Sequence, residues 1–538
     1  MRSDILKHKT YLYLTEFFAG MSVMAVELGA SRLLAPYFSS SQIVWTIIIA
    51  TIMIAMALGN LYGGRSADRD PNPDRLYARL LLAAVWIAAI PLVGRYIIIG
   101  ITGLLVMTVN ENFLVLAAFA ACLVIFVFPC FLLGTCTPSL ASYAVTNLSE
   151  SGSTVGKLGA YNTIGSIIGT FLPTFVTIPA IGTAATFILF SGVLLALSLV
   201  YFISKNVHWR RCAAAVLVFV LCTVFGSRSS FAFWEKDLTA ETESVYNYLQ
   251  VKDTEESTVL STNVLFGVQS ITMKTDELTG LYYDIAMAAP VMAERLLREK
   301  GEQERPLKIL VLGMGTGTFA GQCLQYLDSP EITGVEIDSR ITELSYRYFD
   351  APKEANVVTY DGRAFLAADS SVYDVIMVDA YQDITIPFQM SSIEFFTLVR
   401  EHLTPEGIMV VNMNMRTGSE DGINTWLSDT IAAVFPSILT VDVRNTTNRE
   451  LFASASALSG SLLLEGSLQV TDAELRELME QTAAGFRTYE SGSRILTDDR
   501  APVELLGMQA IDAIISEELR YYKEIFRKEG ISGLLSSM

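Results

Sequence analysis

The stretch Leu307–Leu327, LKILVLGMGTGTFAGQCLQYL, has the pattern of a buried strand, a glycine-rich turn and a helix. Further apolar strands follow at intervals and are separated by segments with helical spacing. They are EITGVEID (331–338), NVVTYDGRAFL (356–366), YDVIMVDAY (373–381) and GIMVVNM (407–413). This alternation predicts a Rossmann-like, doubly wound parallel sheet. Before it, between Glu241 and Gly280, short alternating segments predict a small antiparallel β region.

The turn that follows the first strand has the features of a nucleotide site. Gly313, Gly315 and Gly317 let the backbone pass close to a ligand, and Thr316 lies between the last two. Glu336 ends the next strand about 20 residues later, where a carboxylate can accept from both hydroxyls of a ribose. The pair predicts a nucleoside site at the carboxyl edge of the sheet.

Two later strand ends add acids to the same edge. Asp361-Gly362 closes the third strand, and its carboxylate is suited to accept from an adenine amino group. Asp379 ends the fourth strand and Asp383 follows shortly after; an acid there can deprotonate or orient an amine. The layout predicts an adenosine-binding site. An NAD site would share its first signals, but no second mononucleotide half or hydride-transfer histidine is evident.

Composition narrows the possible functions. Residues 1–234 carry 14 Lys and Arg against 8 Asp and Glu, whereas the whole 538-residue chain has a net charge of −18. Residues 235–538 therefore carry −24, which argues against nucleic acid as a partner. Six cysteines without paired spacing and three scattered histidines predict no disulfide framework, metal site or histidine triad.

The first 234 residues predict a multi-pass membrane domain of about seven helices, because apolar runs recur with few charges inside them. The candidate crossings are residues 11–36, 43–62, 78–94, 113–134, 159–180, 183–203 and 212–226. Residues 97–109 form a shorter apolar run, open to interpretation as a half-helix, an interfacial segment or an eighth crossing. Gly165 and Gly169 stand four apart, the spacing of a close helix contact, and Gly159 falls off their face.

Positive charge predicts the orientation of this domain. Three basic clusters fall on one side if each long run crosses once, which places the N-terminus in the cytoplasm. They are Arg2, Lys7 and Lys9, then Arg65, Arg69, Arg75 and Arg79, then Lys205, Arg210 and Arg211. Seven crossings would put the soluble part outside, whereas an adenosyl cofactor is made in the cytoplasm. We expect a cytoplasmic catalytic part, which requires an eighth crossing or a last segment that lies in the interface.

Glu16 and Glu27 lie within the first run, and a carboxyl group facing lipid would be costly. We expect both to face the bundle interior, either as a cation or proton site or as helix-packing groups.

The membrane part resembles a known architecture. The stretches 16–46, 57–71 and 159–175 are similar to bacterial proteins in which a multi-pass domain is fused to a spermidine-synthase-like domain. The likeness covers most of residues 10–205 and implies architecture only. The domains expected are 1–234 (membrane), 235–285 (small β part) and 286–538 (Rossmann-like catalytic part).

Residues 240–510 resemble the spermidine synthases, the polyamine aminopropyltransferases. This resemblance implies transfer of an aminopropyl group from decarboxylated S-adenosylmethionine to putrescine or a related amine, without a metal, and implies a homodimer. It assigns Glu336 to the ribose, Asp361 to the adenine side and Asp379 to catalysis. The matching segment Tyr282-Tyr283-Asp284 supplies a catalytic tyrosine, Tyr282, and two substrate-binding side chains.

Several positions depart from the family pattern. Thr316 stands where the family has an aspartate that meets the aminopropyl ammonium, which weakens the filter against intact S-adenosylmethionine. Asn247, in Tyr246-Asn247, replaces a glutamine on the cofactor side, and Asp383 lies one place later than the family's second acid, which binds substrate. The segment 496–504, LTDDRAPVE, resembles the membrane-fused branch more than the soluble enzymes.

Two alternatives to an aminopropyltransferase of the cell membrane remain. One is an S-adenosylmethionine-dependent methyltransferase, which Thr316 permits. The other is a polyamine transport or sensing protein with a nucleoside-binding domain.

Overall fold

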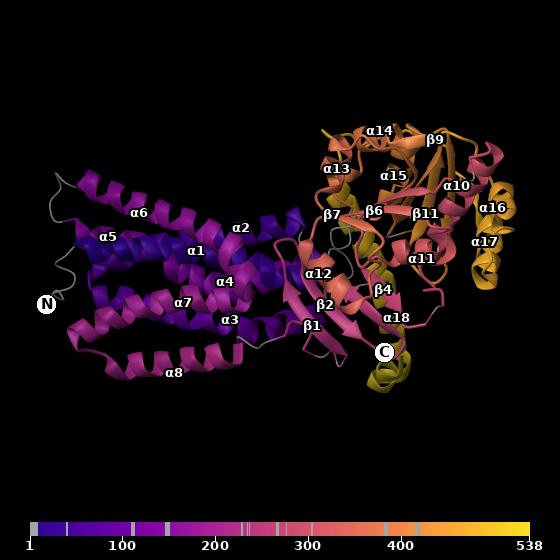
Figure 1. The fold of residues 1–538 in the computed structure, drawn as a ribbon. Helices are drawn as coiled ribbons and strands as arrows, with labels where there is room; N and C mark the ends of the chain where they lie inside the picture. Colours follow the sequence, from indigo (N-terminus) through magenta and orange to yellow (C-terminus); the bar gives the residue numbers. More distant parts are fainter. Residues whose placement is uncertain are drawn as a thin grey trace. The chain divides into compact units, whose positions relative to one another are not determined.

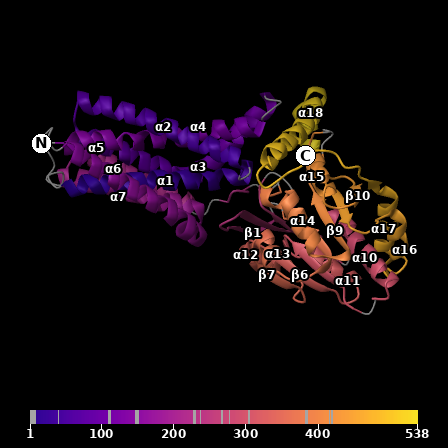
Figure 2. The same ribbon diagram turned by 90° about the horizontal axis from the view of Figure 1, so that it is seen from above.

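The computed structural model forms two compact units (Figures 1 and 2). The first unit contains residues 1–236, 241–248 and 263–265, and the second contains the remainder. The structure describes residues 9–38, 41–108, 113–145, 151–226, 230–233, 235, 237–264, 268–275, 277–302, 305–380, 386–414, 416 and 421–537.

The first unit is a helical bundle. Its helices are α1 (Lys9–Phe38), α2 (Gln42–Arg69), α3 (Pro73–Thr108), α4 (Phe113–Gly134), α5 (Cys136–Ala144), α6 (Ser151–Leu172), the π-helix η3 (Pro173–Thr177), α7 (Ile178–Lys205) and α8 (Trp209–Gly226). Among the described residues, six helical stretches are long and apolar enough to cross a membrane. The fifth, 151–205, contains a break at Gly182, whose φ is 80°. The described part of the run 97–109 continues α3 and forms no helix of its own.

Helices α1 and α6 pack at backbone contact. A Cβ atom on Gly165 would lie 2.0 Å from the carbonyl oxygen of Phe17, and one on Gly169 would lie 2.1 Å from that of Met21. A Cβ atom on Gly159 would meet nothing within 4 Å. The predicted close helix contact is therefore confirmed, and so is the position of Gly159 outside it.

Hydrogen bonds identify the two ends of the bundle. At one end, the N-terminal parts of α1 and α3 meet through Thr15 and Tyr77, whose hydroxyls are 3.1 Å apart, and Lys205 at the end of α7 pairs with Asp74. At the other end, Tyr37 donates to the carbonyl of Phe231. The basic residues 65–79 and 205–211 lie at the end of the bundle that contains Tyr77 and Asp74, because α2 meets α3 there and α7 meets α8.

The chain leaves the bundle at the end away from these clusters. Helix α8 begins next to α7, where His208 contacts Phe202, and ends at Gly226 near Pro91 in the second half of α3. Helix α8 therefore runs along the bundle. The side of the membrane on which the catalytic part lies stays a prediction.

Glu16 is fully buried in the bundle, and its Oε1 accepts from the Thr137 hydroxyl of α5 at 2.5 Å and the Asn162 amide of α6 at 2.9 Å. These contacts tie three helices together and agree with an interior position.

A small antiparallel sheet precedes the large sheet in the chain. Its strand order is β1-β2-β3-β4. The strands are β1 (Leu238–Glu243), β2 (Tyr248–Asp253), β3 (Ser257–Ser261) and β4 (Ser270–Met273). The pairs β2–β3 and β3–β4 are antiparallel, which confirms the predicted small β region.

The large sheet has the order β12-β10-β11-β9-β8-β5-β6-β7. Its strands are β5 (Lys308–Leu312), β6 (Glu331–Glu336), β7 (Asn356–Thr359), β8 (Tyr373–Val378), β9 (Leu403–Met413), β10 (Ser437–Asp442), β11 (Arg449–Ser454) and β12 (Arg487–Thr488). Strands β5 to β9 pair in parallel, which confirms the Rossmann-like fold. The edge strands β10 to β12 pair in antiparallel fashion. Strands β10 and β11 are joined by a short turn, and a connection of this length between neighbouring strands forms a hairpin.

Helices lie between the strands and cover the sheet (Figure 1). They are α9 (Tyr282–Ala286), α10 (Ala288–Glu299), α11 (Thr318–Tyr326), α12 (Ser339–Tyr348), α13 (Gly362–Ala368), the 3-10 helix η4 (Phe388–Met390), α14 (Ile393–Glu401), α15 (Ile423–Ala432), α16 (Gly460–Ser467), α17 (Ala473–Gly485) and α18 (Val503–Ser537). Strand β8 is buried along its whole length, as expected of a central parallel strand.

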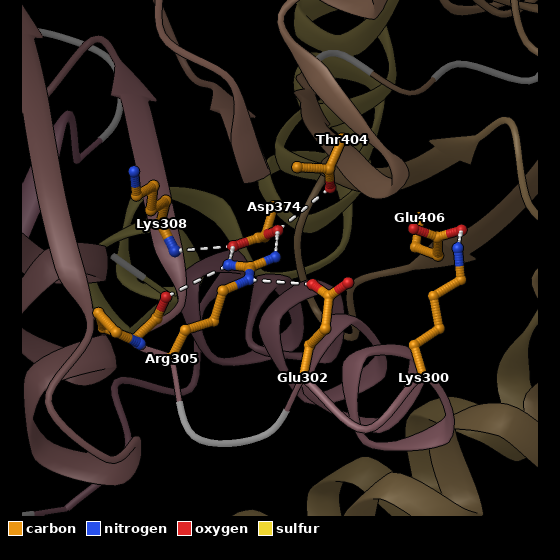
Figure 3. Close-up of polar contacts among 8 residues, drawn as sticks. Lys300, Glu302, Arg305, Lys308, Asp374, Thr404 and Glu406 are labelled. Carbon is orange, nitrogen blue, oxygen red and sulfur yellow. Dashed lines mark hydrogen bonds and ion pairs between the residues drawn. The ribbon is translucent and has the colours of Figure 1, made fainter.

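An ion pair with a buried carboxylate fixes the edge of the sheet where β5, β8 and β9 begin (Figure 3). Arg305 donates to both oxygens of Asp374, at 2.6 and 2.7 Å, and the backbone N–H of Lys308 donates to the same carboxylate. The Thr404 hydroxyl adds a further hydrogen bond. This network lies at the amino ends of the strands. The predicted site residues follow the carboxyl ends, at the opposite edge of the sheet.

Candidate active site

The glycine turn brings the ends of β5 and β8 into contact. Gly313 has a φ of 90°, and a Cβ atom there would lie 2.4 Å from the carbonyl oxygen of Asp379. Gly315 and Gly317 have φ values of 55° and 88°, a conformation that other residues rarely adopt. Gly317 precedes α11, so the turn presents backbone N–H groups at the start of that helix.

Glu336 lies beside the turn, as predicted. Its Oε2 accepts from the backbone N–H of Gly315 at 2.9 Å, and its Oε1 accepts from that of Asp338 at 3.0 Å. Burial raises the pKa of this carboxyl to about 7, although both backbone hydrogen bonds favour the charged form. Each oxygen retains a lone pair for a ligand hydroxyl.

Asp361 and Gly362 lie one strand farther along the edge, after β7. The Asp361 carboxylate accepts from the backbone N–H of Ala364 at 2.8 Å and caps α13. The cap does not use the second oxygen of this carboxylate. The adenine contact of Asp361 stays a prediction.

Asp379 is the centre of a hydrogen-bonded group. The Tyr282 hydroxyl donates to its Oδ2 at 2.6 Å, and the Asn412 amide donates to its Oδ1 at 2.9 Å. Burial raises the pKa of the Asp379 carboxyl to about 7, and these two donors oppose the shift. A carboxyl group with a pKa near neutrality is suited to accept a proton at physiological pH.

Thr316 and Tyr283 contact β4 of the small sheet. The Thr316 hydroxyl lies 2.6 Å from that of Ser270, and Thr316 is only 1% exposed. The Tyr283 hydroxyl donates to the carbonyl of Gln269 at 3.0 Å. Both side chains hold the small sheet against the glycine turn, and their ligand contacts stay predictions.

Asp284 has a supporting position. Its carboxylate accepts from the N–H and hydroxyl of Thr279, from the N–H of Gly280 and from the Gln322 amide. These donors fix the turn before α9, on which Tyr282 is carried. The contact of Asp284 with substrate stays a prediction.

Two predicted residues fall outside this geometry. Asp383 lies outside the described residues. Asn247 belongs to the first unit, where its backbone N–H donates to the Ser244 hydroxyl at 2.8 Å, and its role at the cofactor stays a prediction.

Sequence reasoning missed three polar side chains behind Asp379. The Asn448 amide donates at 2.8 Å to the carbonyl oxygen of the Asn412 side chain, which in turn holds Asp379. Glu450 faces Asn412 across the pair β9–β11. A polar residue inside an otherwise apolar strand, as in VVNM, is the signal that identifies Asn412.

The described residues contain no group of three or more His, Cys, Asp or Glu side chains arranged to hold a metal ion. The site thus combines the glycine turn and the carboxyl groups that follow β6 and β7 with the Asp379 carboxyl, whose pKa is raised, at the end of β8. A Rossmann-like sheet with acids at its carboxyl edge is the layout expected of a transferase that acts on an adenosyl compound.

Comparison with known proteins specifies the class. The Spermine/spermidine synthase domain matches residues 296–441. A probable polyamine aminopropyl transferase of Bifidobacterium longum is 52% identical over 360 residues, which cover 64% of this chain and 78% of that protein. The chain belongs to the polyamine aminopropyltransferase family.

Two further similar proteins have lower identity. The polyamine aminopropyltransferase of Vibrio vulnificus is 23% identical over 306 residues, covering 54% of this chain and 98% of that protein. A crystal structure of a probable spermidine synthase from Corynebacterium glutamicum is 19% identical and covers 47% of this chain and 96% of that chain, with a TM-score of 0.35.

Proposed function

We propose that this protein is a membrane-bound enzyme that transfers an aminopropyl group from decarboxylated S-adenosylmethionine to putrescine or a related short amine. The observation that carries the proposal is the Asp379 carboxyl, held by Tyr282 and Asn412 next to the glycine turn. Family membership supports the same reaction.

The nucleoside of the co-substrate fits the edge formed by β5, β6 and β7. Glu336 accepts from the ribose hydroxyls, Asp361 lies on the adenine side, and the turn 313–317 lies where the sulfonium end approaches Asp379. The turn and Glu336 are held by backbone hydrogen bonds before any ligand binds, so little ordering is needed on binding.

The reaction is a displacement at the carbon next to a sulfonium. A bond forms between the amine nitrogen and the propyl carbon while the bond from that carbon to sulfur breaks, and the electron pair leaves with sulfur as a neutral thioether. The nitrogen then loses one proton to Asp379.

The protein must also supply a neutral amine, because free alkyl amines have pKa values near 10.4. Asp379 can take the first proton from the ammonium, directly or through Tyr282, and release it to solvent before the displacement. The remaining work is alignment of the two substrates in a site with little water.

Thr316 favours a second candidate, methyl transfer from intact S-adenosylmethionine. The Thr316 side chain is neutral and is engaged by Ser270, so it supplies neither attraction for an aminopropyl ammonium nor repulsion for the carboxylate of the intact cofactor.

Calorimetric titration of the full-length protein with the two cofactors separates these candidates. If aminopropyl transfer is the reaction, the decarboxylated cofactor should bind more tightly, and Thr316→Asp should widen the difference by adding a charge that repels the carboxylate of the intact cofactor. Equal or tighter binding of the intact cofactor would favour the methyltransferase.

The bilayer is the remaining partner that we propose, through the six apolar helical stretches of the first unit. A homodimer, implied by the family resemblance, is tested by measuring the mass of the protein purified in nanodiscs.

A further inference from the structure

Glu450 is a buried acid that the proposed chemistry has not used. It is 0% exposed, and among the described residues neither of its carboxyl oxygens has a hydrogen-bond partner. Burial and the nearby charge of Asp379 raise the pKa of Glu450 well above its usual range. A buried carboxyl group without a partner is costly, and such a group in a functional region requires an explanation.

The sheet register places Glu450 in one row with Asp379. Val378 pairs with Val411, so Asp379 lies level with Asn412, and Asn412 pairs with Glu450 on β11. Paired residues share a face of the sheet. The three side chains therefore form a row across β8, β9 and β11, on the face from which Asn412 reaches Asp379.

The basic side chains near Glu450 pair with Asp442. Arg449 precedes Glu450 on the opposite face of β11 and donates to Asp442 at 2.6 Å, and Arg416 donates to the same carboxylate. Asn448, on the same face as Glu450, is engaged by Asn412. The described neighbours thus offer Glu450 no counter-charge.

The strand order gives the direction of the acceptor amine. The nucleoside residues lie on β5, β6 and β7, on one side of Asp379, whereas β9 and β11 lie on the other. An amine attacking in line with the departing sulfur approaches from the side away from the cofactor, and the rest of its chain extends over β9 and β11.

We infer that Glu450 binds the distal ammonium of a short diamine whose other nitrogen reacts at Asp379. Two strand spacings separate the carriers of these acids, on the order of 10 Å. A diamine with three to five methylenes and one hydrogen bond at each end spans a distance of this size. The inference rests on the proposed aminopropyl transfer and names the substrate class that it accepts.

The test is Glu450→Gln in the full-length protein, a change that keeps the shape and removes the carboxyl group that would ionise on pairing with an ammonium. Putrescine and butylamine serve as acceptors, because they differ in the distal ammonium. Wild type should prefer putrescine, and Glu450→Gln should reduce that preference about 10- to 100-fold, mainly through the KM for putrescine, since a charge-assisted hydrogen bond is lost.

Affinity for decarboxylated S-adenosylmethionine, measured by calorimetry, reports whether the variant is folded. An unchanged preference in a variant that binds the co-substrate would overturn the inference and leave aminopropyl transfer standing. If wild type transfers the group to neither amine, both the inference and the proposed function are wrong.

Discussion

Asp379 is the residue on which the chemistry depends, because its pKa of about 7 lets it exchange a proton near neutrality. Asp379→Asn keeps the shape and the hydrogen bond from Tyr282 but cannot accept a proton, so turnover should fall ~10²–10⁴-fold. Cofactor affinity should change far less, since Glu336 and the glycine turn hold the nucleoside separately. A steady-state rate and a calorimetric titration measure the two effects.

The pH profile checks the same assignment. The raised pKa means that Asp379 is protonated, and inactive as a base, below about pH 7. The value of kcat/KM at saturating co-substrate should therefore fall about tenfold per pH unit below 7, and this limb should vanish in Asp379→Asn. A limb that persists in the variant would assign the base elsewhere.

Glu336 should control binding of the nucleoside. Glu336→Ala removes an acceptor worth ~1.5–3 kcal/mol for each charge-assisted hydrogen bond, so affinity for the adenosyl compound should fall at least tenfold. Glu331→Ala, at the exposed start of the same strand, is the matched control. Equal affinities of the two variants in calorimetry would contradict a nucleoside site at this edge.

At the scale of single elements, helices α1 and α6 pack so closely that a Cβ atom on Gly165 would lie 2.0 Å from the carbonyl oxygen of Phe17. Gly165→Leu would place side-chain atoms against the carbonyl of Phe17, and overpacking of this kind costs ~1–3 kcal/mol. The melting temperature of the purified protein should drop. Gly159→Leu, whose Cβ meets nothing within 4 Å, should melt like wild type. Equal melting temperatures for both variants would contradict the contact.

The elements show what the sequence could predict. Period-two and apolar patterns identified the strands β5 to β9, and glycine spacing identified the turn 313–317, because these depend on local geometry. The antiparallel edge of the sheet was not foreseen, since pairing of β10 to β12 depends on tertiary contacts. The partner Asn412 was missed for the same reason: its role appears only when β8 and β9 lie side by side.

At the scale of the whole molecule, the orientation of the chain in the membrane is the open prediction. The described basic clusters lie at the end of the bundle away from Phe231, where the chain leaves. The positive-inside rule places the end where the chain leaves the bundle outside, whereas the site of cofactor synthesis predicts a cytoplasmic catalytic part.

Cysteine labelling in intact cells tests the orientation, and the six native cysteines are buried. If the positive-inside rule decides the orientation, Ala457→Cys, in the second unit, should react with an impermeant reagent, whereas Ser153→Cys, near the basic end, should be protected. The reverse pattern would place the catalytic part in the cytoplasm.

The most direct test of the central claim is mass-spectrometric analysis of products from the full-length protein incubated with a short diamine and each cofactor. The account predicts a diamine extended by one aminopropyl group, with an equal amount of methylthioadenosine, from the decarboxylated cofactor only, and no such product from Asp379→Asn. A methylated amine from intact S-adenosylmethionine, or no product from either cofactor, would contradict it.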